Sequence, residues 1–273
     1  MRRARRSVPA TLLMLAFLAY FLLPLFWLFV ASTKSASDLF DSFGLWFARD
    51  FNLVQNIKQL FAVHAVDGGS YLLWIRNSML YSVSSALIAA LLAASAGYGF
   101  AMFRFRGRGA LFWLVLGSVM VPTQALATPT FLLFAEVGLT NSPWSIILPS
   151  SVSPFGVYLM RIYAKRAVPP EVIEAARTDG AGELRIFRSI AFRLLLPGFV
   201  TVALFAFVAS WNNYFLPLIM LSDPKWYPLT VGIRELGTTE ILTGSLVTLA
   251  PLIAGFLLLQ RYWETGLQAG SVR

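Results

Sequence analysis

The sequence is poor in the residue types that build most metal sites and catalytic centres. Its 273 residues contain no cysteine and a single histidine, and only 13% of them are charged. The absence of cysteine excludes disulfides and thiolate metal sites. The one histidine, His64, has no potential metal ligands near it in the sequence, so we interpret it as an ordinary loop residue. With one histidine and no H-E-x-x-H segment, the sequence predicts neither catalytic residues nor a metal site.

A nucleotide-binding P-loop is absent as well. The chain has no G-x-x-x-x-G-K-[ST] segment, and no glycine is followed by lysine anywhere. Six long apolar runs also lack charged residues, whereas proton-coupled carriers and intramembrane hydrolases usually need ionisable groups inside their spans. We therefore expect no cofactor in this chain, and we expect any energy source to lie in another protein.

Hydrophobic residues are what the sequence has in abundance, at 58% of the chain. Each of the six apolar runs reaches the roughly 20 residues that a helix needs to cross a bilayer. Strands of a membrane β-barrel would be about half as long and would alternate polar with apolar residues. The sequence therefore predicts an all-α membrane protein with one domain over residues 1–273. The six predicted transmembrane helices are 10–32, 77–102, 110–135, 139–161, 197–221 and 242–261.

The distribution of Lys and Arg predicts how these spans are oriented. With the N-terminus inside, 16 of the 22 basic residues fall in cytoplasmic segments, as the positive-inside rule requires. Both termini are then cytoplasmic, and the net charge of +9 needs no nucleic acid to explain it. The first run resembles a cleaved signal peptide, but it is long for one and lacks a good A-x-A site, so an uncleaved helix is favoured.

The predicted outer segment after the first span contains a pattern typical of a short helix. Apolar residues recur at helical spacing from Leu53 to Phe61, opposite Asn52, Gln55, Asn56 and Lys58. Two interpretations stay open: a helix lying on the outer membrane surface, or a helix packed against the bundle.

The longest charged segment, Glu171–Pro197, must be aqueous because charged groups are costly in lipid. Pro169 and Pro170 suit a first helical turn, and the sequence Asp179-Gly180-Ala181-Gly182 has the chemistry of a turn. A second helix is expected from Glu183 to Phe192. Together these features predict a cytoplasmic helix-turn-helix over residues 165–196, either a simple connector or a docking element for a cytosolic partner.

Uncharged polar residues inside the runs gather beside prolines, which free backbone carbonyls and allow kinks. Hydroxyl, amide and aromatic groups suit a neutral polyhydroxylated solute, although such residues more commonly just pack helices together. Because successive helical residues point about 100° apart, we expect one of the two asparagines 212 and 213 to line a cavity and the other to bond a neighbouring helix. The candidate solute-path residues are Gln124, Ser153, Trp211, Asn212, Asn213 and Tyr214.

The charged segment resembles the EAA loop of ABC-importer permeases in the carbohydrate-uptake branch. The matching residues are Glu174-Ala175-Ala176, with Asp179-Gly180-Ala181 after them. The chain departs from that branch at Phe192-Arg193, where Leu-Pro is usual, so a different geometry is expected there. Further motifs in matching order make the chain look most like the second permease of a maltose-type system: Asn77-Ser78, Ala96–Ala101, Gly138–Ser142, Pro154-Phe155-Gly156, Trp211-Asn212, Pro217-Leu218 and Gly266–Gly270.

This resemblance implies a function and a set of partners. A permease of this kind sits in the bacterial cytoplasmic membrane beside a second, similar permease. It works with two ATP-binding subunits, which hold ATP and Mg, and with an extracytoplasmic solute-binding protein. The six EAA-loop residues named above would couple this chain to an ATP-binding subunit. Glycerol phosphate or a polyol is the alternative solute to a sugar, and a channel or scaffold that needs no ATP is the alternative of another class.

Overall fold

The computed structural model describes residues 8–63 and 68–271, with side chains described as far as residue 257. His64 lies outside the described residues. Within them the secondary structure is helical, and no β-strand element is formed. The chain divides into a first compact unit, residues 1–72 with 233–250, and a second compact unit, residues 73–232 with 251–273.

The first unit contains α1 (Val8–Ser32), α2 (Asp38–Asp41), α3 (Leu53–Ala62), η4 (Ile233–Glu235) and the first part of α14 (Thr238–Ser271). Helix α3 forms where the sequence predicts it, but its buried residues are Asn56 and Leu60, whereas Val54 is 63% exposed. The Asn56 amide donates to the carbonyls of Ser32 and Lys34, both at 2.9 Å. Asn56 therefore satisfies carbonyls at the end of α1, and the expected polar face of α3 is wrong at this residue.

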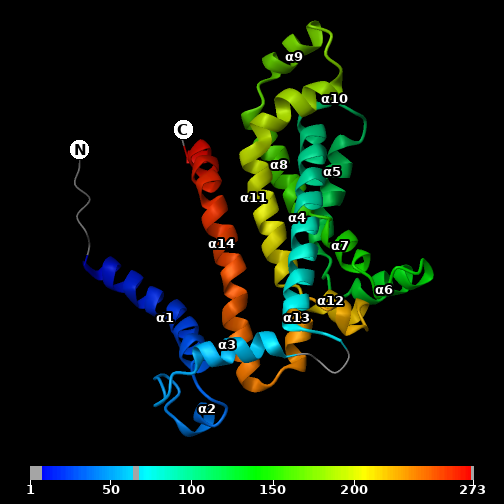
Figure 1. Ribbon diagram of the computed structural model, residues 1–273. Coiled ribbons are helices and arrows are strands. Elements are labelled where there is room, and N and C mark those ends of the chain that lie inside the picture. Colours follow the sequence, from blue (N-terminus) through cyan, green and yellow to red (C-terminus); the bar gives the residue numbers. More distant parts are fainter. Residues whose placement is uncertain (1–7, 64–67, 272–273) are drawn as a thin grey trace. The chain divides into compact units, whose positions relative to one another are not determined.

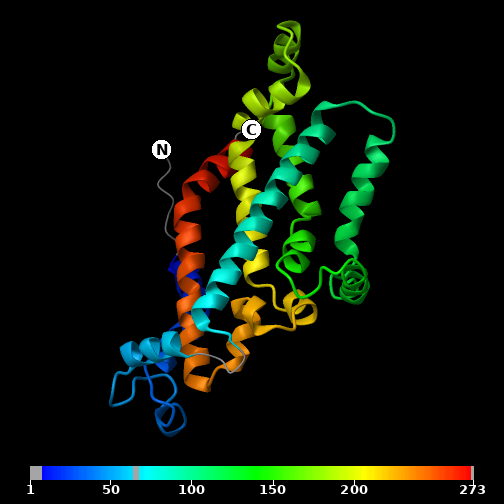
Figure 2. The same ribbon diagram turned by 45° about the vertical axis from the view of Figure 1, so that its right-hand side comes forward.

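The second unit is built on three long helices that run side by side (Figures 1 and 2). In Figures 1 and 2, α4 (Tyr71–Met102), α8 (Pro154–Ala167) and α11 (Phe192–Trp211) run side by side, and α9 (Pro170–Thr178) and α10 (Glu183–Ile186) lie beyond their common end. The remaining helices of this unit are α5 (Arg108–Gly117), η1 (Ser118–Met120), α6 (Ala127–Glu136), α7 (Trp144–Ser150), η2 (Phe187–Ala191), α12 (Phe215–Met220), η3 (Pro224–Trp226) and α13 (Leu229–Gly232).

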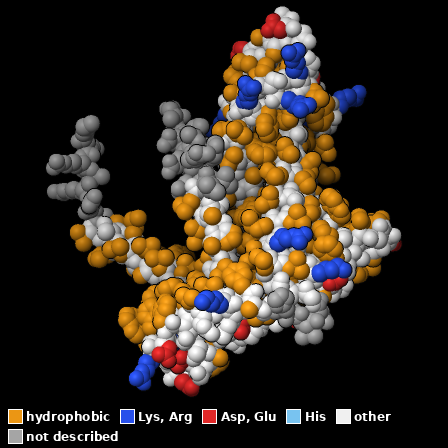
Figure 3. Space-filling model, viewed as in Figure 1, with side chains coloured by type: hydrophobic (Ala, Val, Ile, Leu, Met, Phe, Trp, Pro, Cys, Tyr) orange, Lys and Arg blue, Asp and Glu red, His pale blue; other side chains and the backbone are white. Residues whose placement is uncertain are grey.

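Small residues allow α4 to pack closely against α8 and α11. Ala90, Ala93 and Ala94 on α4 are buried in one cluster with Met160 of α8 and Leu195 of α11. Such close approach of the backbones supplies much of the packing energy between apolar helices in a membrane. The hydrophobic effect contributes little there, because lipid tails are as apolar as the side chains. The outward faces stay apolar, as the visible side of α4 in Figure 3 shows.

Four described helices are long and apolar enough to cross a membrane, and a fifth span results if the bent pair of α7 and α8 counts as one. This bend of 41° falls between Pro149 and Pro154, inside the run expected to be one helix over 139–161. Proline removes a backbone donor and clashes with the preceding turn, which explains the break.

Two other predicted spans are also interrupted. The run 110–135 is split into α5 with η1 and, after Pro122, α6. The run 197–221 ends its long helix at Trp211, and α12 follows separately. The six-span count therefore stays a prediction, since the helices of these regions are shorter than the apolar runs that contain them.

The second helix of the charged segment does not end at Phe192. It continues from α10 through the π-helical turn η2 into α11. Residues 183–211 therefore form one continuous helix that is long and apolar enough to cross a membrane. Arg193 has the backbone N–H that a proline would lack, and Pro197 lies inside α11. The expected difference in geometry at Phe192-Arg193 is thus a helix that runs on, with a π turn just before it.

Candidate functional site

A cavity of about 650 Å³ lies in the second unit where three helical spans are broken. The breaks are residues 121–126, 151–153 and 212–214, which follow η1, α7 and α11. None of the described residues that line this cavity carries a charge. The lining residues are Thr123, Gln124, Leu126, Ala127, Thr130, Pro149, Ser150, Val152, Ser153, Ala206, Ala209, Ser210, Asn212, Asn213, Tyr214, Phe215 and Leu216.

The structure brings five of the six candidate path residues together at this cavity: Gln124, Ser153, Asn212, Asn213 and Tyr214. Trp211 is the exception. Its side chain is 5% exposed and stacks on Phe207, with ring centroids 5.7 Å apart and an interplanar angle of 23°. Trp211 is therefore part of the packing of α11 and does not line the cavity.

Both asparagines line the cavity, contrary to the expectation that only one would. That expectation requires a regular helix at residues 212 and 213. Helix α11 ends at Trp211, so the rotation of about 100° per helical residue does not hold for these two residues. The Asn212 amide donates to the Val208 carbonyl at 2.9 Å, one turn back in its own helix. The Asn213 Oδ1 accepts from the backbone N–H of Leu216, in the first turn of α12, at 3.3 Å. The main-chain carbonyl of Asn213 accepts from Thr230 Oγ1 at 2.8 Å.

Ser153 also has a structural role. It is the N-cap of α8, and its Oγ accepts from the backbone N–H of Gly156 at 3.1 Å. A hydroxyl can still donate while it accepts this bond, so its O–H remains able to bond a solute.

Two further serines contribute unsatisfied groups to the cavity. The Ser150 and Ser210 hydroxyl oxygens are buried and have no hydrogen-bond partner among the described residues. Buried polar atoms are normally paired, so these two hydroxyls are exceptions in the wall of the cavity, and both are closed off from solvent in this conformation. Ser150 is one of several serines beside prolines and Ser210 is one among many apolar neighbours, so no sequence pattern distinguishes them.

The turn of the charged segment has a defined backbone geometry. Gly180 has φ +78°, the left-handed region that glycine adopts freely. Its N–H donates to the Arg177 carbonyl, and the Ala181 N–H reaches back to the Ala176 carbonyl, each at 3.0 Å. This is a Schellman motif, which satisfies the last carbonyls of α9.

The predicted coupling residues divide into a buried and an exposed set. Ala176 is buried beside Ile173, Ile186 and Tyr98, in the same core cluster that holds α4, α8 and α11 together. Glu174, Ala175 and Asp179 are exposed, as is Gly180, and Ala181 is half-buried. The exposed set therefore lies on a knob, formed by α9, the turn at residues 179–182 and α10, and the inner side of this knob is continuous with the helical core.

An ion pair closes the turn from outside. The Arg177 Nε donates to Glu183 Oε1 at 2.6 Å, joining α9 to α10. This hydrogen bond raises the pKa of the Arg177 guanidinium. Because both side chains are exposed, we assign the pair a small part of the stability of the knob.

Comparison with known proteins identifies the family. Residues 86–263 match the model of the binding-protein-dependent transport system inner membrane component. The arabinooligosaccharides transport system permease protein AraQ of Halalkalibacterium halodurans is 32% identical, over 95% of this chain and 93% of that protein. The lactose transport system permease protein LacG of Rhizobium radiobacter is 29% identical over the whole of both chains.

A solved structure shares the fold. One chain of a bacterial ABC transporter involved in the import of the acidic polysaccharide alginate superimposes with a TM-score of 0.79 at 20% identity, covering 96% of this chain and 99% of that one. The chain belongs to the binding-protein-dependent transport system inner membrane component family: it is a multi-pass ABC-transporter permease, a transport subunit and not an enzyme.

Proposed function

We propose that this chain forms half of the translocation pathway of an ATP-driven importer for a neutral sugar. The observation that carries the proposal is the uncharged cavity at the three helix breaks, lined by amides and hydroxyls. An amide offers two donors and an acceptor, which match vicinal sugar hydroxyls, and the Tyr214 ring offers a flat apolar face. The arabinooligosaccharide and lactose relatives support the same solute class.

Glycerol phosphate, the first alternative, fits this cavity less well. An anion needs a cation or several donors beside it. Two arginines at span ends, Arg76 and Arg161, are the candidates for binding an anionic solute, and neither is among the residues that line the cavity. The Arg161 guanidinium lies 3.8 Å from the centre of the Phe112 ring, on α5. A polyol offers the same hydroxyls as a sugar, and an uptake panel that includes one distinguishes the two.

The coupling residues Glu174, Ala175, Ala176, Asp179, Gly180 and Ala181 are proposed to seat in one ATP-binding subunit. The complete importer would contain a second permease, two ATP-binding subunits that hold ATP and Mg, and a solute-binding protein. The free energy that drives the conformational change of the importer would come from the different affinities of its two conformations for ATP. Buried residues of the knob pack in one core cluster with residues of α4, α8 and α11. This packing supports transmission of a movement from the knob to the cavity. A channel or scaffold that needs no ATP would have no use for such a knob.

The proposed orientation places both termini and the knob in the cytoplasm, with six spans in all. In whole cells, Lys225→Cys is expected to react with a membrane-impermeant maleimide, whereas Arg177→Cys reacts only after the cytoplasmic membrane is opened. The chain has no cysteine of its own, so each label reports one position. Any outer membrane must first be made permeable to the reagent. The reverse pattern of labelling would show that the orientation is wrong.

The solute path is tested at the two asparagines. We expect Asn212→Ala to lower sugar uptake about fivefold, the effect of losing roughly 1 kcal/mol of hydrogen bonding to the solute. ATPase stimulation by the loaded binding protein should persist, because the knob is untouched. Asn213→Ser is the companion variant, since serine keeps an oxygen that can accept from the backbone N–H of Leu216 while the amide donor is lost.

A control variant outside the cavity separates solute binding from general damage. Ser118→Ala removes an exposed hydroxyl that donates to the Val115 carbonyl of the preceding helix α5, and uptake should be unchanged. Normal uptake in both asparagine variants would remove these residues from the path. Loss of assembly in both would instead assign them to helix packing.

A further inference from the structure

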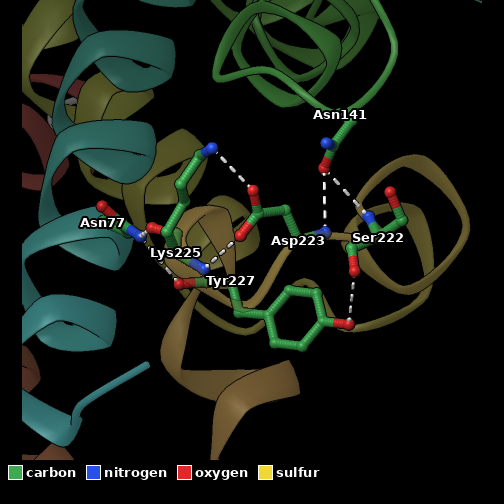
Figure 4. Close-up of polar contacts among 6 residues, drawn as sticks. All are labelled: Asn77, Asn141, Ser222, Asp223, Lys225 and Tyr227. Carbon is green, nitrogen blue, oxygen red and sulfur yellow. Dashed lines mark hydrogen bonds and ion pairs between the residues drawn. The ribbon is translucent and has the colours of Figure 1, made fainter. Parts of the chain in front are cut away.

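An irregular segment, residues 221–228, follows α12 and obtains its hydrogen bonds largely from side chains elsewhere. It contains only the three-residue turn η3, so most of its backbone groups have no helical partner. Side chains of α4 supply several of the missing bonds. Asn77 donates to the carbonyls of Lys225 at 2.8 Å and Tyr227 at 3.0 Å (Figure 4). Trp74 and Tyr81 donate to the carbonyls of Pro224 and Trp226, and Ser78 Oγ accepts from the Leu229 N–H at 2.7 Å.

The other end of this segment is held by Asn141, in the loop between α6 and α7. The Asn141 Oδ1 accepts from the backbone N–H groups of Ser222 at 3.1 Å and Asp223 at 3.0 Å (Figure 4). Its own backbone N–H donates to the Met220 carbonyl at 2.8 Å. Asn141 has φ 52°, and no other non-glycine residue in 8–63 and 68–271 has a positive φ. A residue held in this region at a cost in strain, with three bonds to a distant segment, indicates a specific role.

These bonds join elements that form the wall of the cavity. Phe215 and Leu216, at the start of α12, line the cavity, and Met220, at its end, is bonded to Asn141. The loop of Asn141 also joins α6 and α7, whose residues Thr130 and Ser150 line the same cavity. Buried Ile146 and Ile147 of α7 pack with Met220 and Leu221 directly beside these bonds. One residue thus connects the α6–α7 loop to the end of α12 through its backbone N–H and to the segment after α12 through its side chain.

We propose that Asn141 is a positioning residue for the cavity: it holds the far end of α12, and so keeps Phe215 and Leu216 in place as a wall. The inference rests on the proposed function only in treating the cavity as the solute path. Without the two side-chain bonds of Asn141, the segment after α12 would keep its bonds to α4 and its apolar packing against α7, but it would lose its polar attachment to the α6–α7 loop. The wall would then open more often, and solute would be held less tightly.

The Asp223 carboxylate has other hydrogen-bond partners and does not replace the Asn141 oxygen as an acceptor. Hydrogen bonds from Lys225, first from its side chain and then from its backbone, lower the pKa of the Asp223 carboxyl. The carboxylate therefore stays charged at neutral pH, and its Oδ2 lies 2.6 Å from the Lys225 Nζ. The two backbone N–H groups of this stretch are left for the Asn141 oxygen.

The test uses the assembled transporter with a single reporter cysteine, Ser150→Cys, because the hydroxyl oxygen at this position is buried in the cavity wall. Asn141→Gly keeps the left-handed backbone but removes the accepting oxygen. We expect N-ethylmaleimide to label residue 150 about five- to thirtyfold faster in this variant, as the loss of two hydrogen bonds of roughly 1 kcal/mol each predicts. The KM for solute uptake should rise by a similar factor while the maximal ATPase rate is kept.

Two variants separate positioning from general loosening of the loop. Asn141→Asp keeps an accepting oxygen and tolerates the left-handed backbone, so slow labelling and a near-normal KM should return. Ser142→Ala removes a bond within the same loop, from its Oγ to the Leu139 carbonyl at 2.6 Å, and should leave both readouts unchanged. Labelling at normal speed in an assembled Asn141→Gly transporter would overturn the proposal.

Failure to assemble is also decisive. If Asn141→Gly does not assemble, the milder truncation Asn141→Ser takes its place. If that variant also fails while Asn141→Asp assembles, Asn141 is a folding determinant and the positioning role is wrong. Faster labelling with an unchanged KM would support the role of Asn141 in the wall, yet would count against the cavity as the solute path. The labelling is measured without solute, so the two proposals fail in different ways.

Discussion

A Gly180→Ala permease is expected to reach the membrane in normal amounts and yet lose most of its ATP-driven uptake. The methyl group itself has room, since a Cβ built on Gly180 meets nothing within 4 Å. The cost comes from the backbone, because φ +78° is unfavourable by roughly 1–2 kcal/mol for a residue with a side chain. A strain of this size lowers the equilibrium constant for forming the turn about five- to thirtyfold, and uptake should fall by up to the same factor.

The structure offers a matched control two residues away. Gly182 has φ −71°, lies in the same turn and also has open space around a built Cβ. Gly182→Ala should therefore transport normally, with normal stimulation of the ATPase by the loaded binding protein. Uptake and ATPase rates that are normal in both variants would reduce the knob to a connector. Equal loss in both would mean that the partner needs bare glycine surface, independent of backbone strain.

The second large effect is expected at Gly97, where α4 crosses α8. A Cβ at this position would lie 2.5 Å from the Met160 Cβ, 2.7 Å from the Arg161 nitrogen and 2.8 Å from the Met160 carbonyl carbon. Two of these three atoms are backbone, so no rotation of a side chain relieves the clash, and the two helices must separate. Overpacking of this kind costs typically 1–3 kcal/mol. Gly97→Ala should thus lower the thermal unfolding temperature of the purified protein and reduce its amount in membranes.

Gly99 is the natural control on the same helix. A Cβ there meets nothing within 4 Å, and alanine is the better helix former by up to about 1 kcal/mol. Gly99→Ala should leave the unfolding temperature unchanged or raise it slightly. If Gly97→Ala were as stable as the native protein, the close crossing of α4 and α8 would not be the source of stability assigned to it here.

Local chemistry in the sequence determines much of the knob. Pro170 begins α9 because it lacks the N–H that a first helical turn cannot use. The glycine at 180 ends it, since a left-handed residue is needed to close the motif. These are interactions between residues a few positions apart, so they can be predicted from the sequence. The end of the second helix cannot be predicted in this way, because its continuation into α11 depends on packing of Ile186 and Ala191 against α4 and α8.

The apolar runs likewise predict that the chain is an all-α membrane protein, because the cost of burying charge in lipid acts on composition alone. They do not predict where helices break. Prolines mark the candidate positions, yet Pro197 and Pro251 lie inside helices while breaks follow Pro122 and Pro149. Whether a helix continues past a proline depends on which neighbour satisfies the freed backbone groups, and that neighbour is distant in sequence.

The cavity likewise depends partly on the sequence alone and partly on the tertiary structure. The sequence alone determines that its residues are polar, uncharged and placed within apolar runs. Only the tertiary structure decides that Asn212 and Asn213 face one space, that Trp211 is turned into the packing of α11, and that Asn141 bonds a segment some eighty residues later. The physical reason is hydrogen-bond accounting: an irregular backbone in a membrane protein must find partners on other helices, and a single strand of sequence does not say which helices will be near.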